Sequence, residues 1–149
     1  MIPRRAGMKC SEVMTENPVC CLPSDSVSQV ARVMRREHIG PVPVVTDERT
    51  REIIGIVTDR DLAIKVVAES RDPNRTTVGD VMTHTIIVCR EDDDLSSAIA
   101  AMEEYEIRRI PVIDHGGRLV GIISQADLTT RSHEQVASAT MIEEISRAA

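Results

Sequence analysis

The sequence predicts an α/β (α+β) fold in which two β-α-β-β-α repeats pack as a pseudo-two-fold pair. One observation is an internal repeat that covers most of the chain of 149 residues. Another is that both copies show the same succession of apolar runs, helical faces and turn residues. The third is size, because one copy of about 60 residues buries too little surface to be comfortably stable alone. We therefore expect the copies to pack sheet against sheet, share one core and leave clefts between them.

The repeat keeps one register over a long stretch. The segment Val13-Met14-Thr15 recurs as Val81-Met82-Thr83, an offset of 81 − 13 = 68 residues. After a loop that is two residues longer in the first copy, the offset becomes 121 − 55 = 66, and Gly55-Ile56-Val57-Thr58 matches Gly121-Ile122-Ile123-Ser124. Self-similarity with a single loop-sized slip indicates that one structural unit is duplicated.

Each copy opens with a short apolar strand, expected at 19–22 and at 86–89. A helix follows, and in the first copy Ser26 and Gln29 have the spacing of a capping box. Apolar residues recur at i, i+3, i+4 and i+7 from Val27 and from Leu95. This period predicts one buried face on each helix.

A hairpin and a second helix complete each copy. The hairpins join apolar, β-branched runs across a charged or glycine-rich loop, at 42–45 with 53–57 and at 110–113 with 119–123. The second helices are expected from Asp59 toward Ala68 and from Gln125 toward Arg131. The repeats therefore occupy residues 9–69 and 78–131, with a linker at 70–77 and a C-terminal helical tail at 132–149.

Composition and charge exclude several function classes. The formal net charge is −6, there is no block of Lys and Arg, and one tyrosine is the sole aromatic side chain. Nucleic-acid binding needs clustered cations and usually aromatic side chains, so we expect no nucleic-acid partner. Neither a membrane-length apolar run nor a signal-peptide pattern is present, so we expect a cytoplasmic protein with no membrane partner. The motifs of nucleophilic, phosphate-loop and metal-ligand sites are missing, so we expect neither catalysis nor a metal site.

One motif stands at both junctions between hairpin and second helix. It reads Gly-h-h-[Ser/Thr]-x-x-Asp, where h is an apolar residue, and it carries Thr58 with Asp61 and Ser124 with Asp127. A helix N-terminus attracts phosphate, and a carboxylate one turn on can accept hydrogen bonds from two ribose hydroxyls. The same residues could instead cap their own helix, since a hydroxyl and a carboxylate at this spacing form a capping box. Spacing alone leaves both interpretations open.

The whole pattern resembles a tandem pair of CBS domains (a Bateman module) over roughly residues 9–131. The resemblance rests on the Val-Met-Thr openings, on the Ile-Gly-Pro-Val-Pro-Val-Val and Ile-Arg-Arg-Ile-Pro-Val-Ile stretches, and on the two Gly-h-h-[Ser/Thr]-x-x-Asp-Leu endings. It implies a non-catalytic regulatory and signal-transduction module that forms a homodimer and acts on an unidentified regulated protein. It also implies clefts for AMP, ADP or ATP as a regulatory ligand, or in some members S-adenosylmethionine or NAD, with no obligatory cofactor.

The resemblance also implies which residues would bind the nucleotide. Asp61 and Asp127 would hold ribose hydroxyls, and Thr58 and Ser124 would contact sugar or phosphate. The backbone and apolar side chains of two stretches would pack against the adenine base. The resemblance therefore places these residues at the site: Ile39, Pro41, Val42, Ile107, Arg108, Arg109 and Ile110.

The two copies differ at this wall. Gly40-Pro41 corresponds to Arg108-Arg109, and Arg60 corresponds to Ala126. We therefore hypothesise two unequal sites, with phosphate bound where Arg60, Arg108 or Arg109 points inward. These arginines could alternatively be solvated or paired with Asp and Glu.

Two other functions remain open from the sequence. The chain could be a ligand-free interaction or stress-response module whose clefts are filled by apolar side chains. It could also be a thiol-based sensor, because Cys21 and Cys89 are equivalent positions (21 + 68 = 89) that could meet across the pseudo-two-fold axis. Buried cysteine usually behaves as a small hydrophobe, which is the plainer interpretation of this pair.

Overall fold

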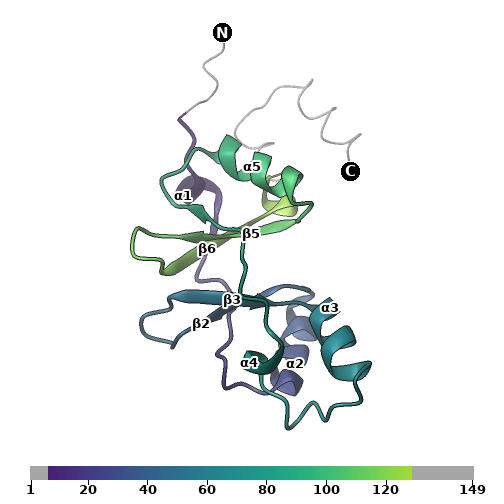
Figure 1. The fold of residues 1–149 in the computed structure, drawn as a ribbon. Coiled ribbons are helices and arrows are strands. Elements are labelled where there is room, and N and C mark those ends of the chain that lie inside the picture. Colours follow the sequence, from purple (N-terminus) through teal and green to yellow (C-terminus); the bar gives the residue numbers. More distant parts are fainter. Residues whose placement is uncertain (1–6, 129–149) are drawn as a thin grey trace.

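The structure, a computed structural model, describes residues 7–128, which form two halves stacked one above the other (Figure 1). The first half contains α2 (Val27–Glu37), β2 (Val42–Val45), β3 (Ile53–Val57), α3 (Asp59–Leu62) and the π-helix η1 (Ala63–Val67). The second contains β4 (Cys89–Arg90), α5 (Leu95–Glu104), β5 (Arg109–Ile113) and β6 (Leu119–Ser124), then a helix described over 125–128. Three short elements open the repeats: α1 (Cys10–Val13), β1 (Thr15–Glu16) and α4 (Val78–Val81). The predicted helix end at 131 and the tail at 132–149 lie outside the described residues.

Local sequence sets the bounds of α2. The N–H of Gln29 donates to Ser26 Oγ (3.1 Å) and the N–H of Ser26 donates to Gln29 Oε1 (2.8 Å), which confirms the predicted capping box. The helix ends at His38, whose φ of 56° is left-handed and whose N–H donates to the carbonyl of Met34. The buried face carries apolar residues one turn apart, namely Val27, Val30 and Met34.

Both predicted hairpins form, one in each half. β2 pairs antiparallel with β3, and β5 pairs antiparallel with β6. The first strand of each repeat is shorter than predicted. Of residues 19–22, Cys21 forms a single β-bridge, and of residues 86–89, Cys89 alone lies in a strand, β4. Each lies beside a strand that contains a proline, Pro43 or Pro111, and proline has no N–H to donate to the ladder. The parallel pairing therefore extends over one residue in the first half and two in the second.

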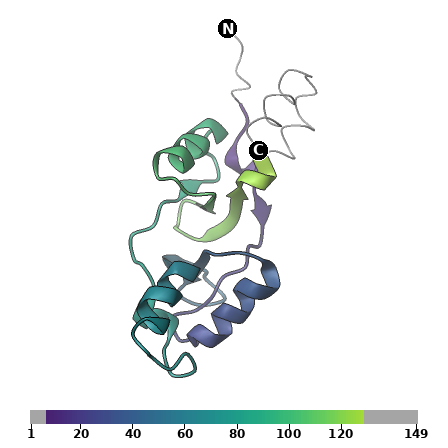
Figure 2. The same cartoon turned by 90° about the vertical axis from the view of Figure 1, so that its right-hand side faces the viewer.

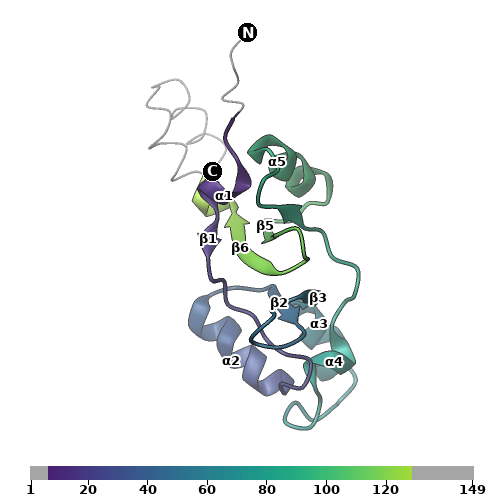
Figure 3. The same ribbon diagram turned by 90° about the vertical axis from the view of Figure 1, so that its left-hand side faces the viewer.

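The opening segment of each repeat packs in the opposite half. β1 pairs antiparallel with β6, joining Thr15 to Ile122, and Figure 3 shows α1 and β1 beside β6. In the same way, Thr83 pairs with Ile56 of β3 through two hydrogen bonds of 2.8 and 2.9 Å. A repeat that is continuous in sequence therefore crosses from one half to the other.

Buried apolar side chains form two clusters, not the single shared core that we expected. The cluster in the first half includes Val78 and Val81 of α4, and the cluster in the second half includes Cys10 of α1. Each half thus completes its own core with the opening helix of the other repeat. Figure 2 shows the larger helices on the outer sides of the two halves, with strands between them.

The two hairpins meet around the predicted pseudo-two-fold axis. Glu52 and Arg118 are equivalent in sequence (52 + 66 = 118), and they form a β-bridge with each other. Equivalent positions pair with one another where a two-fold axis passes between them, so the pseudo-symmetry is confirmed. Main-chain hydrogen bonds of 3.1 and 2.8 Å flank the bridge, from Ile53 to Gly117 and from Leu119 to Arg51.

The second helix of the first repeat is present but changes type along its length. α3 continues into η1, where the N–H of Ala68 donates to the carbonyl of Ala63 (2.9 Å), a step of five residues instead of four. In this wider turn Val66 is buried, and Lys65 reaches back to Asp61 of α3.

Candidate functional site

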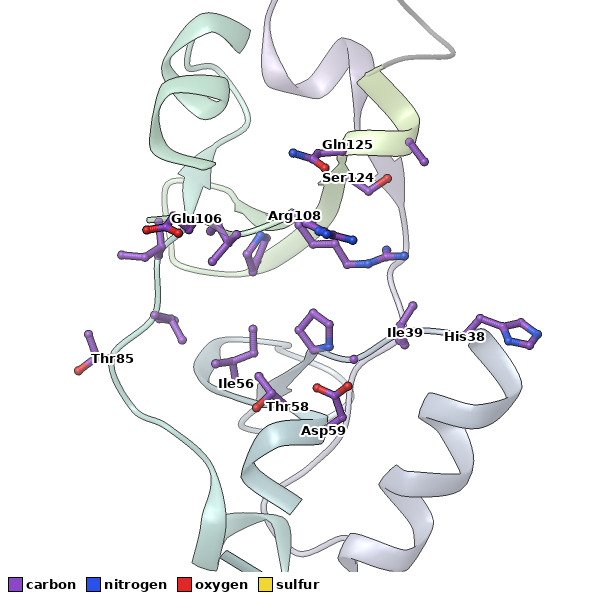
Figure 4. A pocket seen from close by; sticks show the side chains of 18 residues that line it. His38, Ile39, Ile56, Thr58, Asp59, Thr85, Glu106, Arg108, Ser124 and Gln125 are labelled. Atoms are coloured by element: carbon purple, nitrogen blue, oxygen red, sulfur yellow. The ribbon is translucent and has the colours of Figure 1, made fainter. Parts of the chain in front are cut away.

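Two connected clefts open between the halves. The first, which we call the large cleft, has a volume of about 840 Å³ and is lined by residues of both halves. In Figure 4, Arg108, Ser124 and Gln125 lie on one wall, and Thr58 and Asp59 lie on the facing wall. This volume falls within the range of small-molecule sites. The large cleft is therefore not filled by apolar side chains, as the ligand-free alternative would require.

The second, which we call the small cleft, has a volume of about 460 Å³. Thr15 and Asn17 of the first opening segment line it together with Asp127 of the second motif. The exchange of opening segments is what brings Thr15 to this motif, through the pairing of β1 with β6. The two clefts share part of their lining, namely Ile39, Pro41, Arg109, Ser124 and Ala126.

Asp127 caps its helix with one carboxylate oxygen and leaves the other available. Its Oδ2 accepts hydrogen bonds from the N–H of Ser124 (3.2 Å) and from the hydroxyl of Thr15 (3.3 Å). The N–H of Asp127 donates to Ser124 Oγ (3.1 Å), which completes the predicted capping box. Within residues 7–128, Asp127 Oδ1 has no hydrogen-bond or ion-pair partner, and the residue lines the small cleft.

Asp61 forms the same cap but has a different second partner. The N–H of Thr58 donates to Asp61 Oδ2 (3.0 Å), and the N–H of Asp61 donates to Thr58 Oγ1 (3.0 Å). Asp61 Oδ1 lies 3.2 Å from the ammonium of Lys65, which also donates to the carbonyl of Val81 (2.9 Å). Asp61 lines neither cleft, and both of its carboxylate oxygens are engaged by the protein itself.

The cationic side chains at the clefts come from the second copy. Arg108 lines the large cleft, and Arg109 lines both clefts. In the part of the chain that the structure describes, neither guanidinium has an ion-pair or hydrogen-bond partner, so the paired alternative does not apply there. Arg60 is exposed and lines neither cleft.

The apolar residues expected at the wall divide between cleft and core. Ile39, Pro41 and Ile107 line the large cleft. Val42 and Ile110 line neither cleft, because they are fully buried in the clusters of their own halves. Every residue of β2 is buried. The strand therefore lacks the alternation of buried and exposed residues that would distinguish core positions from positions lining a cleft.

Sequence reasoning missed three residues that shape the site. Thr15 and Asn17 reach the small cleft through pairing with a distant strand, and nothing in their local sequence indicates that partner. The contact of Lys65 with Asp61 had a signal, because residues four apart on a helix face each other.

The cysteines do not meet as the repeat suggested. Cys21 lies in the cluster of the first half and Cys89 in that of the second, so the hypothesised Cys21–Cys89 pair does not form. Because α1 is exchanged into the second half, the cysteine that packs in the cluster with Cys89 is Cys10, and each thiol shifts the pKa of the other. Burial raises the pKa of Cys21 to about 12, which keeps this thiol neutral.

Residues 7–128 contain neither a metal-type cluster of side chains nor a membrane-length helix. No group of three or more His, Cys, Asp and Glu side chains is placed to hold a metal ion within this range. Across the same residues, no helix is long and apolar enough to cross a membrane.

A family model described as CBS domain matches the chain twice, at residues 10–68 and 78–134. The chain belongs to the CBS domain family. The two matches correspond to the two copies found from the internal repeat, so the resemblance drawn from the motifs is confirmed.

Relatives of this CBS protein come from several organisms. An uncharacterised protein of Methanopyrus kandleri is 34% identical over 117 residues, which are 78% of this chain and 59% of the relative. Hypoxic response protein 1 of Mycobacterium tuberculosis is 32% identical over 117 residues, 78% of this chain and 80% of that protein.

Solved structures share the fold of this CBS pair. The crystal structure of Hypoxic Response Protein I with two coordinated zinc ions is 31% identical, with a TM-score of 0.73, covering 83% of this chain and 98% of that one. The crystal structure of CBSX2 in complex with AMP is 27% identical, with a TM-score of 0.74, covering 89% of this chain and all (100%) of that one.

Proposed function

We propose that this CBS pair is a non-catalytic regulatory module that binds an adenosine-containing ligand, AMP, ADP or ATP, in the small cleft. One observation carries the proposal. The small cleft is lined both by Asp127, one carboxylate oxygen of which has no partner in residues 7–128, and by Arg109, whose guanidinium has no partner in the same residues. A nucleotide offers the matching groups, a ribose diol for the carboxylate and a phosphate for the guanidinium.

The ribose would bind at Asp127. A carboxylate accepts hydrogen bonds only, and two vicinal hydroxyls can both donate to it. Thr15 and Ser124 already hold the other oxygen, so the side chain is fixed in place before a ligand arrives. A group positioned in advance loses little conformational entropy when it binds.

The phosphate would bind toward the large cleft. Arg109 lines both clefts, and Arg108 lines the large one, so a phosphate at the junction would meet two cations. Guanidinium and phosphate form paired, charge-assisted hydrogen bonds that are about twice as strong as neutral ones. A diphosphate or triphosphate would extend into the larger volume of about 840 Å³.

The adenine base would pack on aliphatic and proline side chains. No Phe or Trp exists in the chain, and the lining of the small cleft includes Pro18, Val19, Ile39, Pro41 and Ile122. Burial of the base against such side chains is favourable in proportion to the apolar area removed from water.

The two motifs would bind ligand unequally. Most residues that line the small cleft have pseudo-symmetric equivalents that line the large cleft, but Asp61, the equivalent of Asp127, does not. The Asp61 oxygen that does not cap the helix, Oδ1, forms an ion pair with Lys65 Nζ at 3.2 Å. A ribose diol would have to displace this ammonium, so binding at the first motif would be weaker.

Regulation would follow from the position of the ligand between two halves and an exchanged segment. A ligand shifts a conformational equilibrium only through its different affinity for the two states, and one that bridges both halves favours the state with the closer walls. The second copy of the chain and the regulated protein would contact the outer helices, where Ile64 and Val67 of η1 are 47% and 74% exposed.

Thermal unfolding in the presence of AMP, ADP, ATP, S-adenosylmethionine and NADH tests the proposal. A ligand at a hundredfold excess over its dissociation constant should stabilise the protein by roughly 2.7 kcal/mol. Asp127→Asn should remove this stabilisation, because the amide replaces a charged acceptor while its oxygen can still accept the N–H of Ser124.

Asp61→Asn is the matched control. It makes the same chemical change at the equivalent motif, and the stabilisation by AMP should persist. Loss of stabilisation in both variants would show that the two motifs bind alike. If only S-adenosylmethionine or NADH stabilises the protein, the adenine-nucleotide assignment is wrong; if no compound does, the ligand-free module is the better account.

A further inference from the structure

Cys10 and Cys89 are a buried pair of thiols that the ligand site does not use. Both belong to the apolar cluster of the second half, where their side-chain exposures are 0% and 5%. They come from different segments: Cys10 begins α1, the exchanged helix of the first repeat, and Cys89 begins β4. The thiols are close enough for each to shift the pKa of the other, while the Cys10 thiol donates to the carbonyl of Asp94 (3.9 Å) and the Cys89 thiol donates to the carbonyl of Pro111 (3.8 Å).

The other half shows how unusual this pair is within the molecule. The residue equivalent to Cys10 is Val78 (10 + 68 = 78), and the residue equivalent to Cys89 is Cys21. Val78 and Cys21 lie together in the first cluster, so that half packs a valine against a cysteine at the same place. Valine satisfies the packing at this place, and the thiol of Cys10 adds a chemistry that the equivalent position in the first half lacks.

From this geometry we propose that Cys10 and Cys89 form a reversible disulfide that clamps the exchanged opening segment onto the second half when the protein meets a peroxide. The bond would close between α1 and β4 and would leave the first half without a counterpart. It would be a site of oxidative modification separate from the nucleotide clefts.

The two thiols are not equivalent in reactivity. The neighbouring Cys89 thiol lowers the pKa of Cys10 and outweighs burial and the nearby carboxylates of Asp92, Asp93 and Asp94, which raise it. The neighbouring Cys10 thiol, together with burial, raises the pKa of Cys89. Cys10 also lies on the short helix that must open to admit an oxidant, so it is the thiol that attacks, and Cys89 is the thiol that resolves.

The chemistry balances with hydrogen peroxide as the oxidant. The Cys10 thiolate attacks one peroxide oxygen, the O–O bond breaks, and hydroxide leaves as Cys10 becomes a sulfenic acid. The sulfur of Cys89 then attacks the sulfur of Cys10, the S–O bond breaks, and the hydroxyl leaves as water. Two thiols are oxidised by two electrons in total, and one peroxide is reduced to two waters.

Access to the buried sulfurs requires local opening of α1. This helix has only four residues. It is tied to the loop before α5 by main-chain hydrogen bonds of 2.9 Å from Cys10 to Asp93 and from Ser11 to Glu91. A single turn held by a few such bonds belongs to the segments that open far below the free energy of global unfolding.

The clamp would act on the ligand-bearing segment directly. β1 follows α1, and its Thr15 holds Asp127 at the edge of the small cleft. A disulfide at Cys10 would hold this segment in its paired position, because the chain between Cys10 and Thr15 is short.

Mass spectrometry of the full chain tests the proposal. The protein is treated with hydrogen peroxide, quenched, unfolded and alkylated, then digested with a protease that cleaves after glutamate. Cleavage after Glu12 and Glu16 separates Cys10 from Cys20 and Cys21, which trypsin would leave in one peptide. We expect a Cys10–Cys89 cross-linked peptide that dithiothreitol removes, and a rise in Tm of roughly 5–10 °C on oxidation.

Two variants keep the test interpretable. Cys10→Val introduces the residue that the first half carries at this place, so it should fold, lose the cross-link and show no rise in Tm. Cys21→Val should retain both. Recovery of Cys10 and Cys89 as alkylated thiols after oxidation, or of a bridge that joins other cysteines or two chains, would overturn the proposal.

Discussion

Replacing Gly55 by alanine is expected to lower the free energy of unfolding by about 2–3 kcal/mol, because the new methyl group strikes main chain. A Cβ at Gly55 would lie 2.7 Å from the carbonyl oxygen of Thr83 and 3.1 Å from the sulfur of Met82. Thr83 is bonded to Ile56 by the two hydrogen bonds that hold the exchanged segment of the second repeat. The methyl group can be accommodated only if that segment moves away.

Two further glycine variants calibrate this prediction. At Gly121, the equivalent position, a Cβ would meet the flexible side chain of Met14, so Gly121→Ala should cost less than Gly55→Ala. At Gly116 the nearest atom, Asp114 Oδ1, is 3.6 Å away, so Gly116→Ala should be close to neutral. Urea unfolding followed by circular dichroism measures all three. Equal stabilities for Gly55→Ala and Gly116→Ala would mean that the opening segments are not exchanged.

Arg109→Ala is expected to weaken AMP binding by roughly 10- to 100-fold, the effect of losing a hydrogen-bonded charge pair of about 1.5–3 kcal/mol. Arg109 is the arginine that lines both clefts, and it has no partner within residues 7–128 to compete for it. Because the guanidinium would bind phosphate, the affinity for adenosine should change little. Titration calorimetry with AMP and with adenosine separates these effects.

A charge-matched control accompanies this variant. Arg35→Ala removes the same charge from the exposed last turn of α2, away from the clefts, and should leave the AMP affinity within twofold of the wild type. Arg109→Lys should restore part of the affinity, because lysine keeps the charge but loses the paired geometry. An equal loss of affinity for AMP and adenosine in Arg109→Ala would place the arginine at the base or sugar instead.

Much of the fold was predictable from the repeat, because its register placed both hairpins and the helices that follow Ser26 and Asp94. The pairing of β1 with β6 was not predictable, since a two-residue strand has no periodic pattern and its partner lies 107 residues away (122 − 15 = 107). The error about the pairing of Cys21 with Cys89 follows from that missing contact. Cys10 reaches Cys89 only because α1 is exchanged.

The candidate site was predictable in part for a related reason. The motif identified Ser124 and Asp127, and the structure confirms the capping box between them while placing Asp127 in the lining of the small cleft. Ribose binding by Asp127 stays a prediction. Val42 and Ile110 were wrongly expected to line the cleft. A fully buried strand shows no alternation of apolar and polar residues, so its sequence does not indicate which face meets the cleft. Arg60 was a candidate by its place in the motif, but its exposed side chain lies outside both clefts.

Equilibrium dialysis of labelled AMP against the wild-type protein tests the central claim most directly, because it counts sites without assuming which residues form them. We expect one strong AMP site per chain and much weaker binding at any second site. This result follows if Asp127 is available to the ligand while Asp61 is held by Lys65. Two sites of equal strength, or no retained AMP at millimolar concentration, would contradict it.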